Sequence, residues 1–252
     1  MRAAAIIPVK RLDAAKQRLA PELEPESRTR LAEAMLDDVL DAVDASRALD
    51  RVIVVTGDPR AARSARGRGA EVIDDRQDSG HSRAARIGVE RALELRMDAA
   101  ALLPGDCPLL EPVEFDAALA RLSPGRVTIV PDRHGTGTNA LLLAPPDAIE
   151  PAFGDGSRAR HESLARSAGV EGTVEPLASL GPDVDTAADL AAVAELLRGR
   201  PDRAPRTAAA LRDLEPTLML RRPSTEGRSS GRAASEGGAS TGDASGPGGE
   251  TR

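Results

Sequence analysis

Two lysines near the N-terminus are distinctive because lysine is almost absent from this chain. Of the 34 basic residues, only Lys10 and Lys16 are lysines, and all the others are arginine. Both lie close to Arg11 and Arg18, directly after an apolar run. Lysine is a compact point charge that suits phosphate oxygens, and arginine does not replace it freely. The segment has no Walker glycines, but it predicts a cationic loop suited to a triphosphate; a solvated basic loop is the alternative.

Two aspartates stand where a carboxylate is suited to bind a divalent cation. Asp106 follows an apolar run in the segment LLPGDCPLL, and Asp185 lies in the segment DVDTAADL. A carboxylate held at the end of a strand is a good ligand for Mg²⁺ beside substrate phosphates. The competing interpretations are an aspartate that only stabilises a turn at position 106 and a helix N-cap at position 185 or 186.

Glycine-flanked hydroxyl groups form a third kind of candidate site. Thr138 lies in the segment GTGTN, and Gly154 and Ser157 lie in FGDGSRARH, which leads into a helical pattern. Hydroxyls, glycine amides and helix N-termini all attract anions. The alternatives are a hairpin turn and a helix entry capped by Ser157. The three histidines show neither metal-ligand spacing nor a partner nucleophile.

The framework that must position these residues follows from the spacing of apolar residues. Short apolar runs predict strands over residues 4–9, 51–56, 71–73, 99–103, 126–130 and 139–143. Helical spacing predicts helices over 26–45, 82–95, 112–122, 158–168 and 186–197. This alternation indicates a three-layer α/β fold with a mostly parallel sheet, and the missing helix between the last two strands predicts an antiparallel excursion. Ligands of such folds bind beyond the carboxyl ends of the strands.

Composition divides the chain into a folded part and a tail. Residues 1–200 carry the strand and helix patterns, so we expect one folded domain there. Residues 201–252 are rich in Gly, Ser and Arg, and from residue 224 onward no Leu, Ile, Val, Phe or Met occurs. Such a segment buries too little apolar surface to offset the entropy of ordering, so we predict a disordered tail. Residues 207–220 have marginal helical character, which Pro216 interrupts.

The overall composition excludes several classes of protein. A single cysteine cannot form an intramolecular disulfide and indicates a reducing compartment. No apolar run is long enough to span a membrane, so we expect a cytoplasmic protein without membrane partners. The net charge of −6 and the absence of Trp and Tyr argue against nucleic acid as a partner. The sequence is compatible with a homodimer.

The motifs occur together in an order found in one enzyme family. IIPVKRLDAAKQRLA, LLPGDCPLL, GTGTNALLL, FGDGSRARH and DVDTAADL resemble the guanylyltransferases of coenzyme F420 biosynthesis, which act on phosphoenolpyruvate in actinobacteria and on 2-phospho-L-lactate in archaea. The resemblance covers residues 3–195 and implies the nucleotide-diphospho-sugar transferase (GT-A-like) fold. It also implies transfer of GMP from GTP to the phosphate of a three-carbon acid, with Mg²⁺ and release of pyrophosphate.

The resemblance assigns roles to individual residues. Asp106 and Asp185 would hold Mg²⁺, and Lys10, Lys16 and Asp106 would be the catalytic residues. Phosphoenolpyruvate would be bound by Thr138, Gly154 and Ser157. GTP would be bound by Pro8, Lys10, Lys16, Arg18, Gly80 and Ser82. The chain departs from the family at one turn, where the usual Gly-Leu-Asn is Gly80-His81-Ser82.

Several alternatives to this function differ in what the sequence should contain. Other nucleotidyltransferases of the fold, such as molybdopterin guanylyltransferase-like or sugar-phosphate enzymes, usually carry a GxGxR loop after the first strand, and this chain has PVKRLDAAKQR there. A catalytically inert nucleotide-binding module would not require the retained lysines and aspartates. Between the two acids, the bias toward Ala and Arg, as in GC-rich genomes, favours phosphoenolpyruvate over 2-phospho-L-lactate.

Overall fold

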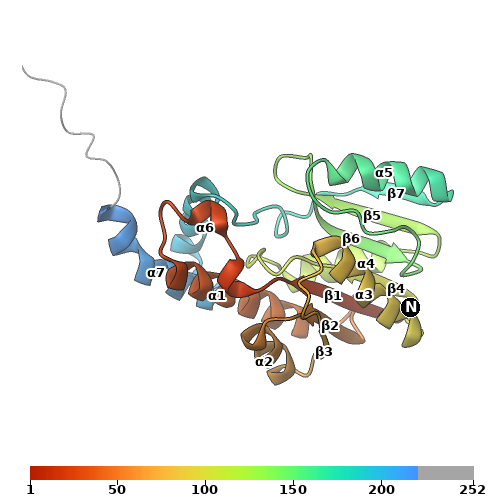
Figure 1. Ribbon diagram of the computed structural model, residues 1–252. Helices are drawn as coiled ribbons and strands as arrows, with labels where there is room; N and C mark the ends of the chain where they lie inside the picture. The colour runs from red at the N-terminus through yellow and green to blue at the C-terminus, as the bar shows by residue number, and fades with distance from the viewer. Residues whose placement is uncertain (221–252) are drawn as a thin grey trace, which may run out of the picture. The chain divides into compact units, whose positions relative to one another are not determined.

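The computed structural model describes residues 1–220, which fold around one seven-stranded sheet (Figure 1). The strands lie in the order β3-β2-β1-β4-β6-β5-β7. Strand β6 runs antiparallel to both of its neighbours, and every other pair of neighbours is parallel. This arrangement confirms the predicted, mostly parallel sheet with one antiparallel excursion. The strands are β1 (Ala3–Val9), β2 (Arg51–Thr56), β3 (Glu71–Asp74), β4 (Ala99–Leu102), β5 (Arg126–Pro131), β6 (Thr138–Ala144) and β7 (Glu171–Val174).

Helices cover both faces of the sheet, which makes the fold three-layered. The helices are α1 (Pro25–Asp44), α2 (Pro59–Gly67), α3 (His81–Glu94), α4 (Pro112–Arg121), α5 (Ser157–Ala168), α6 (Ala187–Gly199) and α7 (Pro205–Leu220), with short 3₁₀ turns η1 (Leu12–Ala14), η2 (Gln17–Leu19) and η3 (Pro201–Arg203). Alternate residues of a strand point to opposite faces. Ala5 and Ile7 of β1 accordingly pack with α1, α2 and α4, whereas Ala4 and Ile6 pack with α3 and α5.

Helix α3 lies unusually close to the central strand. A Cβ atom at Gly88 would overlap the side chain of Ile6, so only glycine permits this approach. The close packing fixes the direction of α3, whose first residue, His81, faces the same cavity as Pro8 and Val9 at the end of β1.

The folded unit extends beyond residue 200, which corrects the predicted domain boundary and the predicted disorder of residues 201–220. Helix α7 packs on α1, on the side away from the sheet (Figure 1). Leu211 and Leu214 are buried against Leu31 and Met35 of α1. The physical reason is a third apolar cluster, which includes Ala204, Ala208, Leu211 and Leu214. From the sequence, residues 207–220 have only marginal helical character, because the residues that bury these side chains lie far away in the chain. The predicted disorder after residue 220 lies outside the described residues.

Helix α7 is also held by hydrogen bonds at its N-terminus. The buried Asp38 carboxylate of α1 accepts the backbone N–H groups of Arg206 at 3.2 Å and of Thr207 at 2.7 Å. It thereby satisfies two of the amides that a helix start leaves unpaired. The helix continues through Pro216, which does not end it as the sequence suggested.

Two further elements were not predicted. Helix α2 is short, with four charged or polar side chains among its nine residues, and β7 is a four-residue edge strand without buried residues.

Within residues 1–220, none of the helices has the length and apolar composition needed to cross a bilayer.

Candidate functional site

A cavity of about 530 Å³ opens beyond the carboxyl ends of β1 and β4. This is the edge of the sheet that the fold class predicts for a ligand. The residues proposed from the sequence that line it are Pro8, Lys10, Lys16, Arg18, Asp106, Thr138, Gly154 and Asp185. Other lining residues, which the sequence did not single out, include Leu12, Met35, Leu36, His81, Asn139 and Phe153. We call this space the main cavity.

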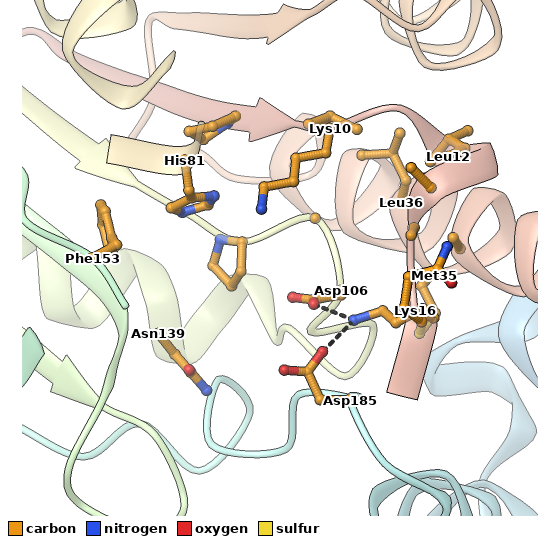
Figure 2. Close-up of a pocket in the computed structure, with 18 of the residues that line it drawn as sticks. Lys10, Leu12, Lys16, Met35, Leu36, His81, Asp106, Asn139, Phe153 and Asp185 are labelled. Carbon is orange, nitrogen blue, oxygen red and sulfur yellow. Dashed lines mark hydrogen bonds and ion pairs between the residues drawn. The ribbon is translucent and has the colours of Figure 1, made fainter. Parts of the chain in front are cut away.

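Lys16 bridges two carboxylates in the main cavity. Its Nζ lies 3.0 Å from Asp185 Oδ1 and also donates a hydrogen bond to Asp106 Oδ2 (Figure 2). Only 6% of the Lys16 side chain is exposed. The residue sits between η1 and η2 in the left-handed conformation, with φ of 55°, which is uncommon for non-glycine residues. Asp106 and Asp185 lie 90 and 169 positions after Lys16 in the chain, and the Lys16 ammonium joins them.

The ionisation of this cluster is set by burial and by the charges within it. Burial lowers the pKa of Lys16, but the carboxylates of Asp106 and Asp185 more than offset this, so its pKa lies above the usual value. Burial likewise raises the pKa of Asp106, and the Lys16 ammonium more than reverses that effect. Asp183 has no such partner, and burial together with the charges of Asp106 and Asp185 raises its pKa to about 6. The cluster therefore has more negative charge than one lysine neutralises.

The carboxylates suit a magnesium ion that is also bound by substrate. Asp106 and Asp185 converge on one cationic centre, the Lys16 ammonium, and Mg²⁺ in nucleotide sites is held by one or two carboxylates together with phosphates. No group of three or more His, Cys, Asp or Glu side chains among residues 1–220 is arranged to hold a metal. A donor set of two aspartates fits Mg²⁺ when phosphate oxygens and water molecules complete the coordination.

The segment that carries Asp185 is tied to β6. The side-chain amide of Asn139 donates hydrogen bonds to the carbonyl oxygens of Leu180 at 2.7 Å and Gly181 at 3.3 Å. Helix α6 begins immediately afterwards, and Thr186 is its N-cap, in a capping box with Asp189. The N-cap is thus Thr186, one of the two positions that the sequence allowed, and the Asp185 carboxylate lines the cavity instead of capping the helix.

The lysine loop is anchored by a buried aspartate that the sequence did not single out. Asp58 Oδ2 accepts the backbone N–H of Leu12 at 2.9 Å, while its Oδ1 accepts the N–H groups of Arg60 at 2.7 Å and Ala61 at 3.1 Å. One carboxylate thus caps α2 and fixes the loop between Lys10 and Lys16. A proline after an aspartate at the end of β2 is the sequence signal of this cap.

A second, smaller cavity of about 280 Å³ adjoins the main one. The two cavities share Arg18, Thr138, Asn139, Gly154 and Asp185. Ser157 lines only the second cavity, so the three residues proposed for the acid, Thr138, Gly154 and Ser157, all contact it. The N-cap of α5 is Gly156, in the left-handed conformation, and Ser157 is the first helical residue. Ser157 therefore does not cap the helix.

Two of the residues proposed for GTP do not line the main cavity. Gly80 and Ser82 lie on either side of His81, which does line it. The Ser82 hydroxyl instead accepts the backbone N–H of Phe153 at 2.9 Å. The Phe153 ring packs edge-on against His81, with ring centroids 4.7 Å apart. The turn Gly80-His81-Ser82 thus joins α3 to the loop before α5. Of its three residues, only His81 lines the main cavity.

Comparisons with known proteins agree with this geometry. A family described as guanylyl transferase CofC like matches residues 3–224. A phosphoenolpyruvate guanylyltransferase of Conexibacter woesei is 45% identical over 212 residues, which are 83% of this chain and 95% of that protein. One of Sphaerobacter thermophilus is 42% identical over 186 residues, 74% of this chain and 89% of that protein.

The fold is also found among solved structures. A structure described as a nucleotide-diphospho-sugar transferase of Desulfovibrio desulfuricans G20 superposes with a TM-score of 0.70 at 18% identity, covering 87% of this chain and 98% of that one. The chain has the predicted nucleotide-diphospho-sugar transferase fold and is a nucleotidyltransferase. With a cationic loop, paired aspartates and a family match over most of its length, the protein belongs to the CofC-like guanylyltransferase family.

Proposed function

We propose that this enzyme transfers GMP from GTP to the phosphate of phosphoenolpyruvate, giving enolpyruvyl-diphospho-guanosine and pyrophosphate, as a step of coenzyme F420 biosynthesis. The observation that carries the proposal is the pair of adjoining cavities, with the Lys16–Asp106–Asp185 cluster beside the residues they share. The names of the similar proteins from Conexibacter and Sphaerobacter support phosphoenolpyruvate as the acceptor.

The cavities divide the substrates between them. GTP occupies the main cavity, where Lys10, Lys16 and Arg18 offer positive charge to its phosphates. The acid occupies the second cavity, where Thr138, Gly154 and Ser157 offer hydroxyl and amide groups to its anionic oxygens. Arg18 lines both cavities, so it can contact the phosphates of GTP and the phosphate of the acid.

The reaction needs positioning and charge neutralisation more than acid–base chemistry. A phosphate oxygen of phosphoenolpyruvate, already an anion at neutral pH, forms a bond to the α-phosphorus of GTP. The bond between that phosphorus and the bridging oxygen of the β-phosphate breaks, and pyrophosphate leaves with the electron pair. No proton has to be removed from the nucleophile, which fits a cavity without a serine or cysteine nucleophile beside a base.

Charge neutralisation falls to the cationic loop and to the paired aspartates. Mg²⁺, held by Asp106 and Asp185, would neutralise charge on the transferring phosphoryl group and orient it. The Lys16 ammonium keeps the two carboxylates together and contacts phosphate oxygens as they enter. Lys10, on the same loop, points into the main cavity (Figure 2).

The test is incubation of the enzyme with GTP, Mg²⁺ and one acid, followed by detection of pyrophosphate. Phosphoenolpyruvate should support release, and 2-phospho-L-lactate should support it less well. Asp106→Asn should abolish release while circular dichroism remains unchanged, and Asp147→Asn, which alters an exposed aspartate outside both cavities, is the matched control. Pyrophosphate release with 2-phospho-L-lactate alone would identify the other acid as the substrate. GTP binding without turnover with either acid would instead indicate an inert nucleotide-binding module.

A further inference from the structure

His161 is a fully buried histidine whose two ring nitrogens both have partners. It lies on α5 and has no exposed surface. Its Nε2 accepts the backbone N–H of Ala152 at 2.9 Å, and its Nδ1 lies 3.0 Å from Thr138 Oγ1. Thr138 lines both cavities, whereas His161 lines neither.

These two contacts determine where the proton of the imidazole lies. A backbone N–H can only donate, so Nε2 must be unprotonated to accept from Ala152. A neutral imidazole then carries its proton on Nδ1. Burial, together with the neighbouring charge of Arg160, lowers the pKa of His161 to about 4, so the ring is neutral at physiological pH. His161 therefore donates its hydrogen bond to the Thr138 oxygen.

The Thr138 hydroxyl consequently has its own proton left to donate. A hydroxyl oxygen that accepts from an imidazole N–H directs its O–H elsewhere, and among the described residues this hydroxyl has no other hydrogen-bond partner. Thr138 is only 8% exposed, and it lines both cavities. We propose that His161 is a positioning residue that fixes the Thr138 hydroxyl as a hydrogen-bond donor to an anionic oxygen of the acceptor substrate.

The same histidine also connects the other side of the acid site. Ala152 precedes Phe153 and Gly154, and the Phe153 ring lies edge-on to His161, with centroids 5.3 Å apart. The imidazole thus holds both Thr138 and the loop that carries Gly154. Hydrogen-bond donors at this position suit a phosphate or a carboxylate of the acceptor. That the acceptor is phosphoenolpyruvate rests on the proposed function.

The protonation state can be measured without turnover. The chain has only three histidines, His81, His134 and His161, so long-range ¹H–¹⁵N spectra of the wild type and of His81→Gln and His134→Gln variants can assign each ring. We expect His161 to be the neutral tautomer protonated on Nδ1 at pH 7. A ring protonated on Nε2 would overturn the proposal even if the enzyme is fully active.

The functional consequence is tested with paired variants. Thr138→Val should raise the KM for phosphoenolpyruvate at least roughly tenfold, as expected for a hydrogen bond to a charged group, and leave the KM for GTP within about twofold. Thr138→Ser should retain a KM near that of the wild type. His161→Asn can place an amide nitrogen near the Nδ1 position, whereas His161→Gln can place only an acceptor near Nε2. We therefore expect His161→Asn to retain most of the affinity for the acid and His161→Gln to lose it.

A double variant separates positioning from general loss of structure. If His161 acts through the hydroxyl, His161→Gln combined with Thr138→Val should have a KM for the acid no higher than that of Thr138→Val alone, because the two changes remove one interaction. Additive effects on KM, or an unchanged acid KM in Thr138→Val, would overturn the proposal. A wild-type protein that releases no pyrophosphate from GTP and phosphoenolpyruvate would refute the proposed function, and the tautomer measurement would still decide the position of the proton.

Discussion

Lys16 occupies its position because its backbone adopts a left-handed conformation between two short 3₁₀ turns. That conformation turns the ammonium back toward Asp106 and Asp185, and so converts an exposed basic loop into a buried ion cluster. A solvated basic loop, which composition alone also allowed, would leave all of its cations in water. The structure distinguishes these alternatives through the exposure of one side chain.

Substitution of Lys16 should therefore affect turnover more than folding. Lys16→Ala leaves two neighbouring carboxylates without their shared cation, and Lys16→Arg replaces a point charge by a planar fork that cannot occupy the same point. We expect kcat/KM for GTP to fall by about 10- to 150-fold in Lys16→Ala, the loss of a charge-assisted hydrogen bond, and substantially in Lys16→Arg. Steady-state pyrophosphate release measures both. Full activity of Lys16→Arg would contradict the requirement for a compact ammonium.

His161 should make stability depend on pH. Its folded-state pKa of about 4 lies below the ordinary value of 6.5, so the unfolded chain binds more protons in the range between them. Stability is then complete above about pH 6.5 and is lost as the pH falls toward 4, by up to about 3 kcal/mol from this group. Urea unfolding of wild type and His161→Asn at several pH values should show this loss only in the wild type; parallel curves would contradict it.

At the scale of elements, the loop between β1 and α1 depends on a neighbouring helix cap. Asp58 is buried at the start of α2, yet one of its oxygens holds the backbone of Leu12. The position of the lysines is thus coupled to the folding of α2, an element with no residue in the main cavity.

Asp58→Asn should separate the two functions of this carboxylate. The amide can keep an oxygen toward the N–H groups of α2, but its NH₂ group then faces the N–H of Leu12. We expect the KM for GTP to rise roughly three- to tenfold, with unfolding little changed. Asp38→Asn is the matched control, because it weakens the cap of α7 outside the main cavity: stability should fall and both KM values should remain. Equal KM values for GTP in Asp58→Asn and wild type would show that the loop does not need this anchor.

Helix α7 should contribute to stability, contrary to what the composition of the chain beyond residue 200 suggests. Leu214→Ala removes a side chain that is 3% exposed and should cost about 2–5 kcal/mol of unfolding free energy. Leu196→Ala on α6, where the side chain is 49% exposed, should cost far less. A chain ending at Leu220 should unfold like the full chain, and one ending at Arg200 should be clearly less stable. Equal stability of the two truncated chains would mean that α7 does not dock in solution.

The elements that could be predicted from the sequence are those whose apolar pattern is decided locally. The run RVIVVT and the helical spacing of Leu31, Met35 and Val39 identify β2 and α1 without tertiary information. Strand β7 could not be found this way, because EGTV has no buried residue and is extended only through its pairing with β5. Helix α7 was predicted only as a marginal helix interrupted by Pro216, because its apolar residues are buried only by packing against α1.

The same distinction holds for the site. The sequence could select Lys16, Asp106 and Asp185 individually, by type and by position after a strand or before a helix. Their meeting at one point depends on a backbone conformation at Lys16 and on hydrogen bonds from Asn139, neither of which has a local signal. Ser82 illustrates the opposite case: a residue at the expected place in a motif contacts a neighbouring loop instead of the main cavity.

At the scale of the whole molecule, the antiparallel strand β6 separates two binding spaces. It begins at Thr138 and Asn139, which line both cavities and lie between the lysine loop and the start of α5. One ligand can therefore be perturbed without the other, provided that the altered residue lines a single cavity.

Lys10 and Ser157 provide that comparison, since Lys10 lines only the main cavity and Ser157 only the second. Lys10→Ala should raise the KM for GTP and leave that for phosphoenolpyruvate within about twofold. Ser157→Ala should do the reverse, with a rise of roughly two- to tenfold for a neutral hydrogen bond and more for a bond to phosphate. Initial rates over a grid of both substrate concentrations measure the two constants. A rise of the GTP constant in Ser157→Ala would place the nucleotide in both cavities.

The docking of α7 on α1 has a consequence for biosynthesis. Asp38 and Arg206, which meet where the two helices pack, are 168 positions apart in the chain. A ribosome therefore releases α1, with Leu31 and Met35 on its outward side, long before the residues that will cover them have been made. The nascent protein carries an uncovered apolar stripe from the synthesis of α1 until α7 has been made, and such stripes bind chaperones and promote aggregation. Because residues 205–214 must be made before α1 can be covered, slowing translation near residue 200 should increase the capture of nascent chains by trigger-factor-like chaperones.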